Sequence, residues 1–232
     1  MNREVHEVQT VYNELVRPPR DVIEAFHEVL RAEYSPSCLV ADAQERVGAI
    51  GGLRSVKREH RVIGPALTID LPEDDLVDIL PVLPTAQPGD VIVLACHGNT
   101  RMAMWGGLMA TLSQMAGIAG AVVDGAVRDV DELRDLDFPI WYRTTMPRRC
   151  PAAAPAAGRP VRVNVPIVID GAVIEPGDII VAEENGVGVV PPALADEVLA
   201  ATRQLLAKES VVRDKINDGA TLNQLLAEFG YL

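Results

Sequence analysis

Two charged residues, Arg128 and Asp129, end a run of small and β-branched residues, GAVVDGAV (120–127), that is typical of a buried strand. Charged side chains at the end of such a strand must form an ion pair, face the solvent or bind a ligand. A guanidinium can bind a carboxylate ligand through two parallel hydrogen bonds, and an adjacent carboxylate can coordinate a metal ion. The pair therefore indicates a site for a small organic acid, with Asp129 serving a metal.

Both residues also have a purely structural interpretation. Asp129 opens the next predicted helix, where the helix dipole and unpaired N–H groups favour a carboxylate. Arg128 has three acidic neighbours with which it could form a salt bridge: Asp124, Asp131 and Glu132. Asp124 has the same strand parity as Arg128 and can lie on the same face of the strand.

A second feature lies one helix earlier in the chain. The helix predicted over 105–120 begins with two glycines, in WGGLMA, so the N–H groups of Leu108 and Met109 are free to bind an anion. A glycine pair alone is weak evidence, but its position one helix and one strand before Arg128 makes it more specific. His97, in ACHGNTRM, is a further candidate, since it could transfer a proton if its loop faces the site.

The composition limits the partners. The chain has 232 residues, 48% of them hydrophobic, which is enough for the core of one large domain. Its net charge of -12 repels nucleic acid and anionic membranes. Three separated cysteines without zinc spacing, together with an N-terminus that lacks an apolar segment, indicate a cytoplasmic protein with free thiols. No apolar stretch is long enough to span a membrane.

The hydrophobic pattern predicts a mixed α/β chain. Residues 1–34 have the spacing of a helical segment broken at Pro18-Pro19, and 35–232 form an α/β domain with a C-terminal helix. We expect the following elements within the domain: helices over 35–48, 74–86, 105–120, 130–136 and 193–216, strands over 62–71, 88–95, 120–127 and 137–144, several short strands over 161–192, a surface loop over 151–160, and a turn and short helix at the C-terminus.

Two segments of the chain have similar sequences. PGDVIVLACHG (88–98) and PGDIIVAEENG (176–186) share PGD, a run of Ile and Val, and a closing Gly. The two segments are either independent instances of a common turn and strand or a pseudo-symmetric pair within one domain.

Taken together, several blocks resemble one family. They are GPALTI, PGDVIV, GGLMATLSQMAGIAGAVVDGAVRDVDEL and VNVPIVIDGAVIEPGDIIVAEENGVGVVP, and the resemblance covers roughly residues 36 to 230. The family contains the 4-hydroxy-4-methyl-2-oxoglutarate/4-carboxy-4-hydroxy-2-oxoadipate aldolases and the regulator of ribonuclease E activity A. The resemblance implies a compact single-domain "swivelling" α/β/α-type sandwich with mixed sheets, in homotrimers or homohexamers with active sites at subunit interfaces.

The resemblance also implies roles for the residues singled out above. Arg128 would bind the carboxylate of pyruvate, with help from the backbone amides of Leu108 and Met109. Asp129 would serve magnesium or manganese, which polarises the 2-keto oxygen and stabilises the pyruvate enolate released by retro-aldol cleavage. The same chemistry makes oxaloacetate decarboxylase activity an expected side reaction. Oxygen ligands suit magnesium or manganese better than zinc.

The chain departs from the aldolases at Gly107, where they carry an acidic residue that supports the metal. Three outcomes are open. Water could fill the gap while Asp129 holds the metal, another carboxylate could replace the missing one, or the metal and the aldolase reaction could be lost. The nearest candidates for a replacement carboxylate are Asp124, Glu183 and Glu184.

A second departure is the segment Glu183-Glu184-Asn185, which stands where the family has a more acidic DDDG-like pattern. In the family this loop lies close to the neighbouring subunit's site, so a role for Glu183 or Glu184 is one interpretation. A solvated turn is the other.

We therefore expect a metal-dependent lyase that cleaves or decarboxylates a 2-oxo acid through a pyruvate enolate. One alternative is a non-catalytic regulator that acts by protein–protein contact. The other is a metal-independent enzyme of altered chemistry on an acidic substrate, such as a hydrolase or isomerase, in which Arg128 still binds the carboxylate.

Overall fold

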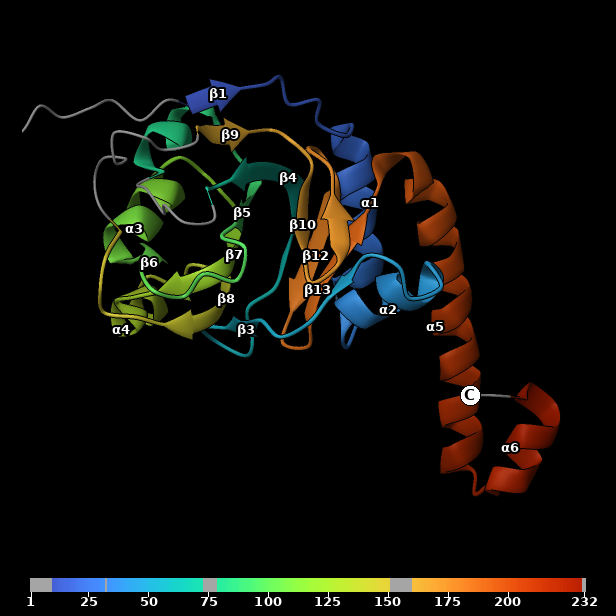
Figure 1. Ribbon diagram of the computed structural model, residues 1–232. Coiled ribbons are helices and arrows are strands. Elements are labelled where there is room, and N and C mark those ends of the chain that lie inside the picture. Colours follow the sequence, from blue (N-terminus) through green and yellow to red (C-terminus); the bar gives the residue numbers. More distant parts are fainter. Residues whose placement is uncertain (1–9, 32, 73–78, 151–159, 231–232) are drawn as a thin grey trace, which may run out of the picture.

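Helices cover both outer faces of the β-structure in the computed structural model, which describes residues 10–31, 33–72, 79–150 and 160–230 (Figure 1). The strands are β1 (Thr10–Tyr12), β2 (Ala49–Ile50), β3 (Arg54–Ser55), β4 (Val62–Asp70), β5 (Val91–Ala95), β6 (Ala103–Trp105), β7 (Gly120–Val127), β8 (Ile140–Thr145), β9 (Val161–Val163), β10 (Ile167–Ile169), β11 (Ala172–Ile174), β12 (Ile179–Glu183) and β13 (Gly186–Val190). The helices are α1 (Arg20–Leu30), α2 (Pro36–Ala43), α3 (Gly107–Met115), α4 (Val130–Asp135), α5 (Ala195–Asn217) and α6 (Leu222–Phe229), with short 3-10 helices η1 (Leu80–Thr85) and η2 (Pro192–Leu194).

Strand β4 joins the two halves of the main sheet, whose strand order is β2-β13-β12-β4-β5-β7-β8-β3. Its residues 62–65 pair antiparallel with β12, and its residues 66–70 pair parallel with β5. Strands β5, β7 and β8 are parallel to one another, and the short strand β6 is parallel to β7. The carboxyl ends of β5, β7 and β8 therefore meet at one edge of the sheet, as do the residues that follow them.

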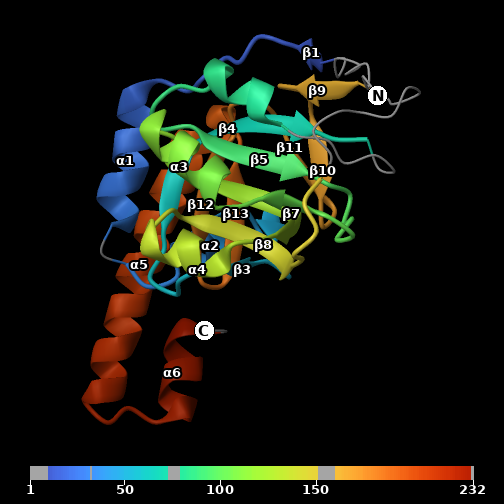
Figure 2. The same cartoon turned by 90° about the vertical axis from the view of Figure 1, so that its left-hand side faces the viewer.

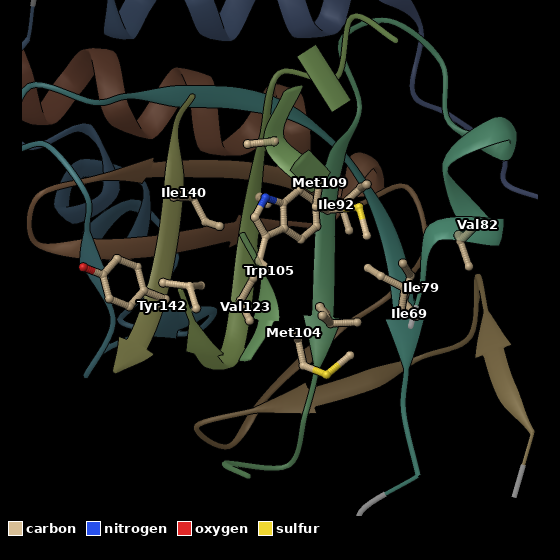
Figure 3. Packing of buried hydrophobic residues seen from close by; sticks show 14 of the residues in the cluster. Ile69, Ile79, Val82, Ile92, Met104, Trp105, Met109, Val123, Ile140 and Tyr142 are labelled. Carbon is tan, nitrogen blue, oxygen red and sulfur yellow. The ribbon is translucent and has the colours of Figure 1, made fainter. Parts of the chain in front are cut away.

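The side chains of the central strands alternate between two cores. Ile92 and Leu94 of β5 belong to the core beneath α3 and α4, whereas Val91 and Val93 belong to a core shared with β12 and β13. This burial on both faces explains why the parallel strands are apolar throughout. Figure 3 shows the first core, in which Trp105 of β6 packs with residues of the neighbouring strands.

A third core lies on the outer face of β12 and β13, where α1, α2 and α5 pack. Figure 1 shows these helices on one side of the molecule and α3 and α4 on the other. Two β layers therefore lie between two helical layers, and the prediction of a mixed α/β fold is confirmed. None of the helices within the described residues is long and apolar enough to cross a membrane.

The N-terminal prediction was wrong in part. Residues 1–9 lie outside the described residues, but Thr10–Tyr12 form a strand that pairs with β9 instead of a helix. The spacing of Val11 and Leu15 fits a helix, yet backbone pairing with a distant strand determines the local conformation. Within the described residues of this segment, helix is found only after Pro18-Pro19, as α1.

The helix predicted over 74–86 was also wrong in its described part. Residues 73–78 lie outside the description, and 80–85 form the 3-10 helix η1, which contains Pro81 and Pro84. Proline has no N–H group to donate and disfavours a continuous α-helix, so a tighter turn forms instead. The loop predicted over 151–160 lies outside the described residues except for Pro160, whereas α2, α3, α4, α5 and α6 confirm the other predicted helices.

The two PGD turns share their hydrogen bonding. Asp90 Oδ2 accepts the Gln87 N–H at 2.8 Å, and Asp178 Oδ2 accepts the Glu175 N–H at 2.9 Å. The strands that follow, β5 and β12, flank β4 on opposite sides and run in opposite directions. Asp90 has an additional partner, because Arg17 Nε and Nη2 donate to its two oxygens at 2.7 and 2.6 Å.

Asp178 should make the stability depend on pH. Burial raises its pKa from the ordinary value of 3.8 to about 6. Between these two values the folded chain binds a proton that the unfolded chain has released, so this group's contribution to stability is lost as the pH rises from about 4 to 6. We expect Asp178→Asn, whose amide oxygen can still accept the Glu175 N–H, to lack this loss in urea titrations across that range. Parallel profiles for the two proteins would contradict the expectation.

The C-terminal helices extend away from the sheets (Figures 1 and 2). The buried residues of α5 lie in its first part: Ala195, Val198, Leu199 and Thr202. Helix α6 begins with a capping box between Thr221 and Gln224, and Lys215 of α5 contacts Glu228 at 2.8 Å. The C-terminal part of α5, together with α6, thus forms an arm in which few side chains are buried against the rest of this chain.

Candidate active site

The candidate site lies where β6 and β7 end side by side. Trp105 pairs with Val127 in parallel register, and the Arg128 N–H donates to the Trp105 carbonyl at 2.9 Å. The chain then continues into Gly106-Gly107 and α3 from one strand, and into Arg128-Asp129 and α4 from the other. These two turns are therefore brought together by the sheet.

Side chains of the neighbouring turn lie close over both glycines. A Cβ on Gly106 would lie 2.6 Å from Asp129 Oδ2 and 3.1 Å from Arg128 Cγ. A Cβ on Gly107 would lie 1.9 Å from Glu132 Oε2. Neither residue has a positive φ, so close approach and not backbone conformation explains the glycine pair.

Asp129 directs its carboxylate toward α3. Its backbone is in the left-handed region (φ 54°, ψ 43°), which Asp tolerates better than most residues. Its side chain makes no capping hydrogen bond to α4, and Asp129 Oδ2 instead accepts the Gly107 N–H at 3.3 Å. Asp129 is therefore the N-cap residue of α4, as its structural interpretation expects, but its side chain does not cap the helix.

Arg128 is held through one nitrogen. Its Nε lies 3.3 Å from Asp129 Oδ2, and its side chain is 34% exposed. None of the three acidic neighbours considered from the sequence forms an ion pair with Arg128. Asp124 binds Arg143 instead, and neither Asp131 nor Glu132 lies within ion-pair distance of the guanidinium. Among the described residues, the terminal nitrogens of Arg128 have no acceptor, which leaves them available to a ligand.

Arg128 lines a cleft of about 190 Å³. The described lining contains two guanidiniums, from Arg128 and Arg149, and no carboxylate, and the rest of it comes from Leu80, Ala103, Met104, Trp105, Gly106, Leu108, Met109, Leu112 and Cys150. The first amides of a helix lack acceptors within the helix, and those of Leu108 and Met109 begin α3 at this cleft. The cleft therefore suits a small anion with an apolar portion.

Arg149 and Glu132 were not selected as site residues from the sequence. Arg149 reaches the cleft because its backbone forms an isolated bridge with Ala103, a contact between distant segments that no local pattern reveals. Glu132 was considered only as a salt-bridge partner for Arg128. Its position three residues after Asp129, on the same face of a helix, was the available signal.

Two of the predicted residues are engaged elsewhere. Asp124 is buried, where it accepts hydrogen bonds from Arg143 Nε and from the Gly98 N–H at 3.0 Å. His97 Nε2 lies 2.8 Å from Asp70 Oδ1 and 2.9 Å from the Leu71 carbonyl. The structure does not bring either side chain to the lining of the cleft.

The acidic pair after β12 is also held outside the cleft. Glu183 is buried and accepts hydrogen bonds from Ser37 Oγ at 2.5 Å and the Asn185 N–H at 3.0 Å, which attaches the β12–β13 turn to α2. Glu184 forms an exposed ion pair with Arg58 at 3.2 Å. Within this chain, neither residue lies with Asp129.

The donor set near Asp129 consists of oxygen atoms. Among the described residues, no group of three or more His, Cys, Asp or Glu side chains is placed to hold a metal ion. Asp129 and Glu132 nevertheless present two carboxylates beside consecutive glycines. Burial raises the pKa of the Cys96 thiol in the core behind the site, so it does not act as a thiolate ligand. The arrangement fits a hard divalent cation that takes its other ligands from water and substrate.

Comparisons with known proteins identify the family of the chain. The model of the RraA-like family, described as Aldolase/RraA, matches residues 37–189. A protein of Halalkalibacterium halodurans, named as a candidate 4-hydroxy-4-methyl-2-oxoglutarate aldolase, is 32% identical over 198 residues, covering 85% of this chain and 90% of its own length. The 4-hydroxy-4-methyl-2-oxoglutarate aldolase of Thermus thermophilus is 32% identical over 131 residues, covering 56% of this chain and 76% of its own.

A solved structure supports the same assignment. The crystal structure of Streptomyces coelicolor RraAS2, described as an unusual member of the RNase ES inhibitor RraA protein family, matches with a TM-score of 0.73 and 27% identity. The match covers 86% of this chain and 99% of that one. From its family match, its relatives and its fold, the chain belongs to the RraA-like (Aldolase/RraA) family.

Proposed function

We propose that this protein is a divalent-metal-dependent lyase that cleaves or decarboxylates a 2-oxo acid and releases pyruvate. The observation that carries the proposal is the guanidinium of Arg128, whose terminal nitrogens face a small cleft beside the first amides of α3. The names of two relatives, which specify 4-hydroxy-4-methyl-2-oxoglutarate aldolase, support the same reaction class.

The residues of the cleft and of the adjoining start of α4 have distinct parts in this reaction. Arg128 binds the carboxylate next to the 2-keto group, and the Leu108 and Met109 amides add donors that orient it. Asp129 and Glu132 would hold magnesium or manganese, which when bound supplies positive charge that stabilises the developing negative charge on the keto oxygen. Trp105, Met109 and Leu112 supply apolar walls against which the rest of the substrate can pack.

Arg149 supports a substrate with a second carboxylate, as 4-hydroxy-4-methyl-2-oxoglutarate has. It lines the same cleft as Arg128, and it is exposed with no acidic partner among the described residues. We expect Arg149→Gln to raise the KM for such a substrate by about tenfold, since an exposed charged hydrogen bond is lost, while oxalate binding stays nearly unchanged. Steady-state kinetics and oxalate titration measure the two effects. Equal weakening of both would contradict separate roles for the two arginines.

The direct test of the reaction is pyruvate release. The protein is incubated with oxaloacetate and with 4-hydroxy-4-methyl-2-oxoglutarate, first with manganese and then with EDTA. Pyruvate formation above the metal-only rate, abolished by EDTA and by Arg128→Gln, is the expected result. Absence of turnover on both substrates, with oxalate binding that still requires Arg128, would instead support a metal-independent enzyme of altered chemistry.

A second candidate is a non-catalytic regulator that acts by protein–protein contact. The likeness to the Streptomyces RraA-family protein, described as belonging to a family of RNase ES inhibitors, favours it, as does the glycine at position 107. The same incubations separate the candidates, because a regulator of this kind would neither release pyruvate nor bind oxalate.

A homotrimer or homohexamer with sites at its subunit interfaces is part of the proposal. The arm formed by the far part of α5 and α6 supports contacts with another subunit, since it exposes the apolar side chains of Val211, Ile216, Leu222 and Leu226. Sedimentation equilibrium measures the assembly state. A small carboxylate ligand remains the proposed binding partner.

A further inference from the structure

We infer that Glu132 provides the second carboxylate of the metal site, in the space that Gly107 leaves open. This inference rests on the proposed function, because it concerns the same metal ion. In relatives with an acidic residue at the start of α3, that residue would supply the second carboxylate. In this chain, a residue of α4 would supply it instead.

The position of the Glu132 carboxylate carries the inference. A Cβ built on Gly107 would lie 2.0 Å from Glu132 Cδ and 1.9 and 2.5 Å from its two oxygens. The carboxylate of Glu132 therefore fills the volume in which any side chain at position 107 would begin. A side chain at position 107 would therefore have to displace the Glu132 carboxylate from its present place.

Asp129 lies beside the same glycines. Its Oδ2 is 3.3 Å from the Gly107 nitrogen and 2.6 Å from the Cβ position of Gly106. Asp129 is the N-cap residue of α4 and Glu132 lies in the first turn of that helix, and the side chains of both reach the α3 turn. Two carboxylates from α4 thus lie over consecutive residues of the α3 turn.

The local charge favours a cation. Among the described residues, Glu132 has no ion pair and accepts no hydrogen bond, whereas Asp129 shares one oxygen with Arg128 Nε at 3.3 Å. The negative charge of Glu132 therefore has no neighbouring cation among the described side chains, and a bound metal ion would supply one. A hard divalent ion matches both their charge and their oxygen chemistry.

The test measures manganese affinity directly, by electron paramagnetic resonance of free Mn²⁺ and by calorimetry. We expect Glu132→Gln, which keeps the shape and removes the charge, to weaken Mn²⁺ binding by about tenfold or more. Asp131→Asn is the matched control, because it removes one charge from the same helical turn but points about 100° away around the helix. It should change the affinity less than about twofold.

A double-mutant cycle excludes a general structural effect. Gly107→Ala adds a Cβ that collides with the Glu132 carboxylate, and we expect it to weaken Mn²⁺ binding by about tenfold in the wild-type chain but not further in Glu132→Ala. Gly107→Glu combined with Glu132→Ala should restore affinity, because the carboxylate then returns from α3. Thermal unfolding of each variant checks that the fold is retained.

The outcomes are distinguishable. Wild-type binding that Glu132→Gln leaves unchanged would overturn the role of Glu132 while the proposed lyase function stands. A wild-type chain that binds no Mn²⁺, with or without oxalate, would overturn both the inference and the metal requirement of the proposed function. Loss of affinity in Asp131→Asn equal to that in Glu132→Gln would show a general charge effect and would also overturn the inference.

Discussion

Replacing Arg128 by glutamine is expected to weaken oxalate binding by about a hundredfold, because a charged, bidentate interaction worth about 2 to 3 kcal/mol is lost. Arg128→Lys keeps the charge but not the planar pair of donors, so we expect an intermediate loss of about tenfold. The fold should be unaffected, since the side chain is 34% exposed and, within the described part of the chain, its one ion pair is with Asp129. Isothermal titration calorimetry with oxalate measures both affinities.

Arg101→Gln is the matched control for this prediction. Arg101 is another exposed arginine near the carboxyl ends of the central strands, but its N–H and Nε donate to Asn99 Oδ1 and it does not line the cleft. It should leave oxalate binding unchanged. Equal losses in Arg101→Gln and Arg128→Gln would mean that oxalate responds to the general charge of this face, and specific binding by Arg128 would be contradicted.

Asp124→Asn is expected to destabilise the protein by about 2 to 3 kcal/mol, because it breaks a buried ion pair and weakens a charged hydrogen bond. The carboxylate is almost fully buried, and it binds Arg143 of the neighbouring strand β8 and the Gly98 N–H at 3.0 Å. Arg143 is partly exposed, so water can solvate its charge in part, and the loss should lie below that of a fully buried pair. Urea unfolding of the two proteins measures the difference.

The same variant decides between two roles for Asp124. If Asp124 is structural, Mn²⁺ affinity should be unchanged in Asp124→Asn. As a control, Glu184→Gln removes an exposed ion pair with Arg58 and should cost less than about 1 kcal/mol. Unaltered stability together with a large loss of Mn²⁺ affinity in Asp124→Asn would show instead that Asp124 is the replacement metal ligand considered from the sequence.

Local sequence patterns predicted the parts of the fold that depend on local physics. The run 120–127 is apolar because β7 is buried on both faces between parallel neighbours, and the same reasoning identified β5. The start of α3 was recognised from the glycines before Leu108 and Met109. The proximity of Gly107 to Arg128 depends on β6, which was not predicted because Trp105 was assigned to the helix that follows it.

The remaining features depend on contacts between distant residues. β1 was missed because Val11 and Leu15 have helical spacing, while the partner strand β9 lies far along the chain. Strand parity placed Asp124 on the face of Arg128, but its pairing with Arg143 required knowing that β8 lies beside β7, where the register shifts between Val123 and Ala126. Arg149 likewise reaches the cleft through a bridge to Ala103 that no local pattern contains.

Glu132 shows why the missing acidic residue at position 107 was difficult to interpret from the sequence. Asp124, Glu183 and Glu184 were the replacement carboxylates considered, and each has a partner elsewhere. The residue that does occupy the space over Gly107 was visible only when α3 and α4 were placed against each other.

A crystal structure of the protein with Mn²⁺ and oxalate tests the central claim most directly. We expect one carboxylate of oxalate to be bound by the terminal nitrogens of Arg128 and the amides of Leu108 and Met109. The metal should lie between oxalate and Asp129. Oxalate bound away from this cleft, or Arg128 turned from the ligand to bind an acidic side chain of its own chain, would contradict it.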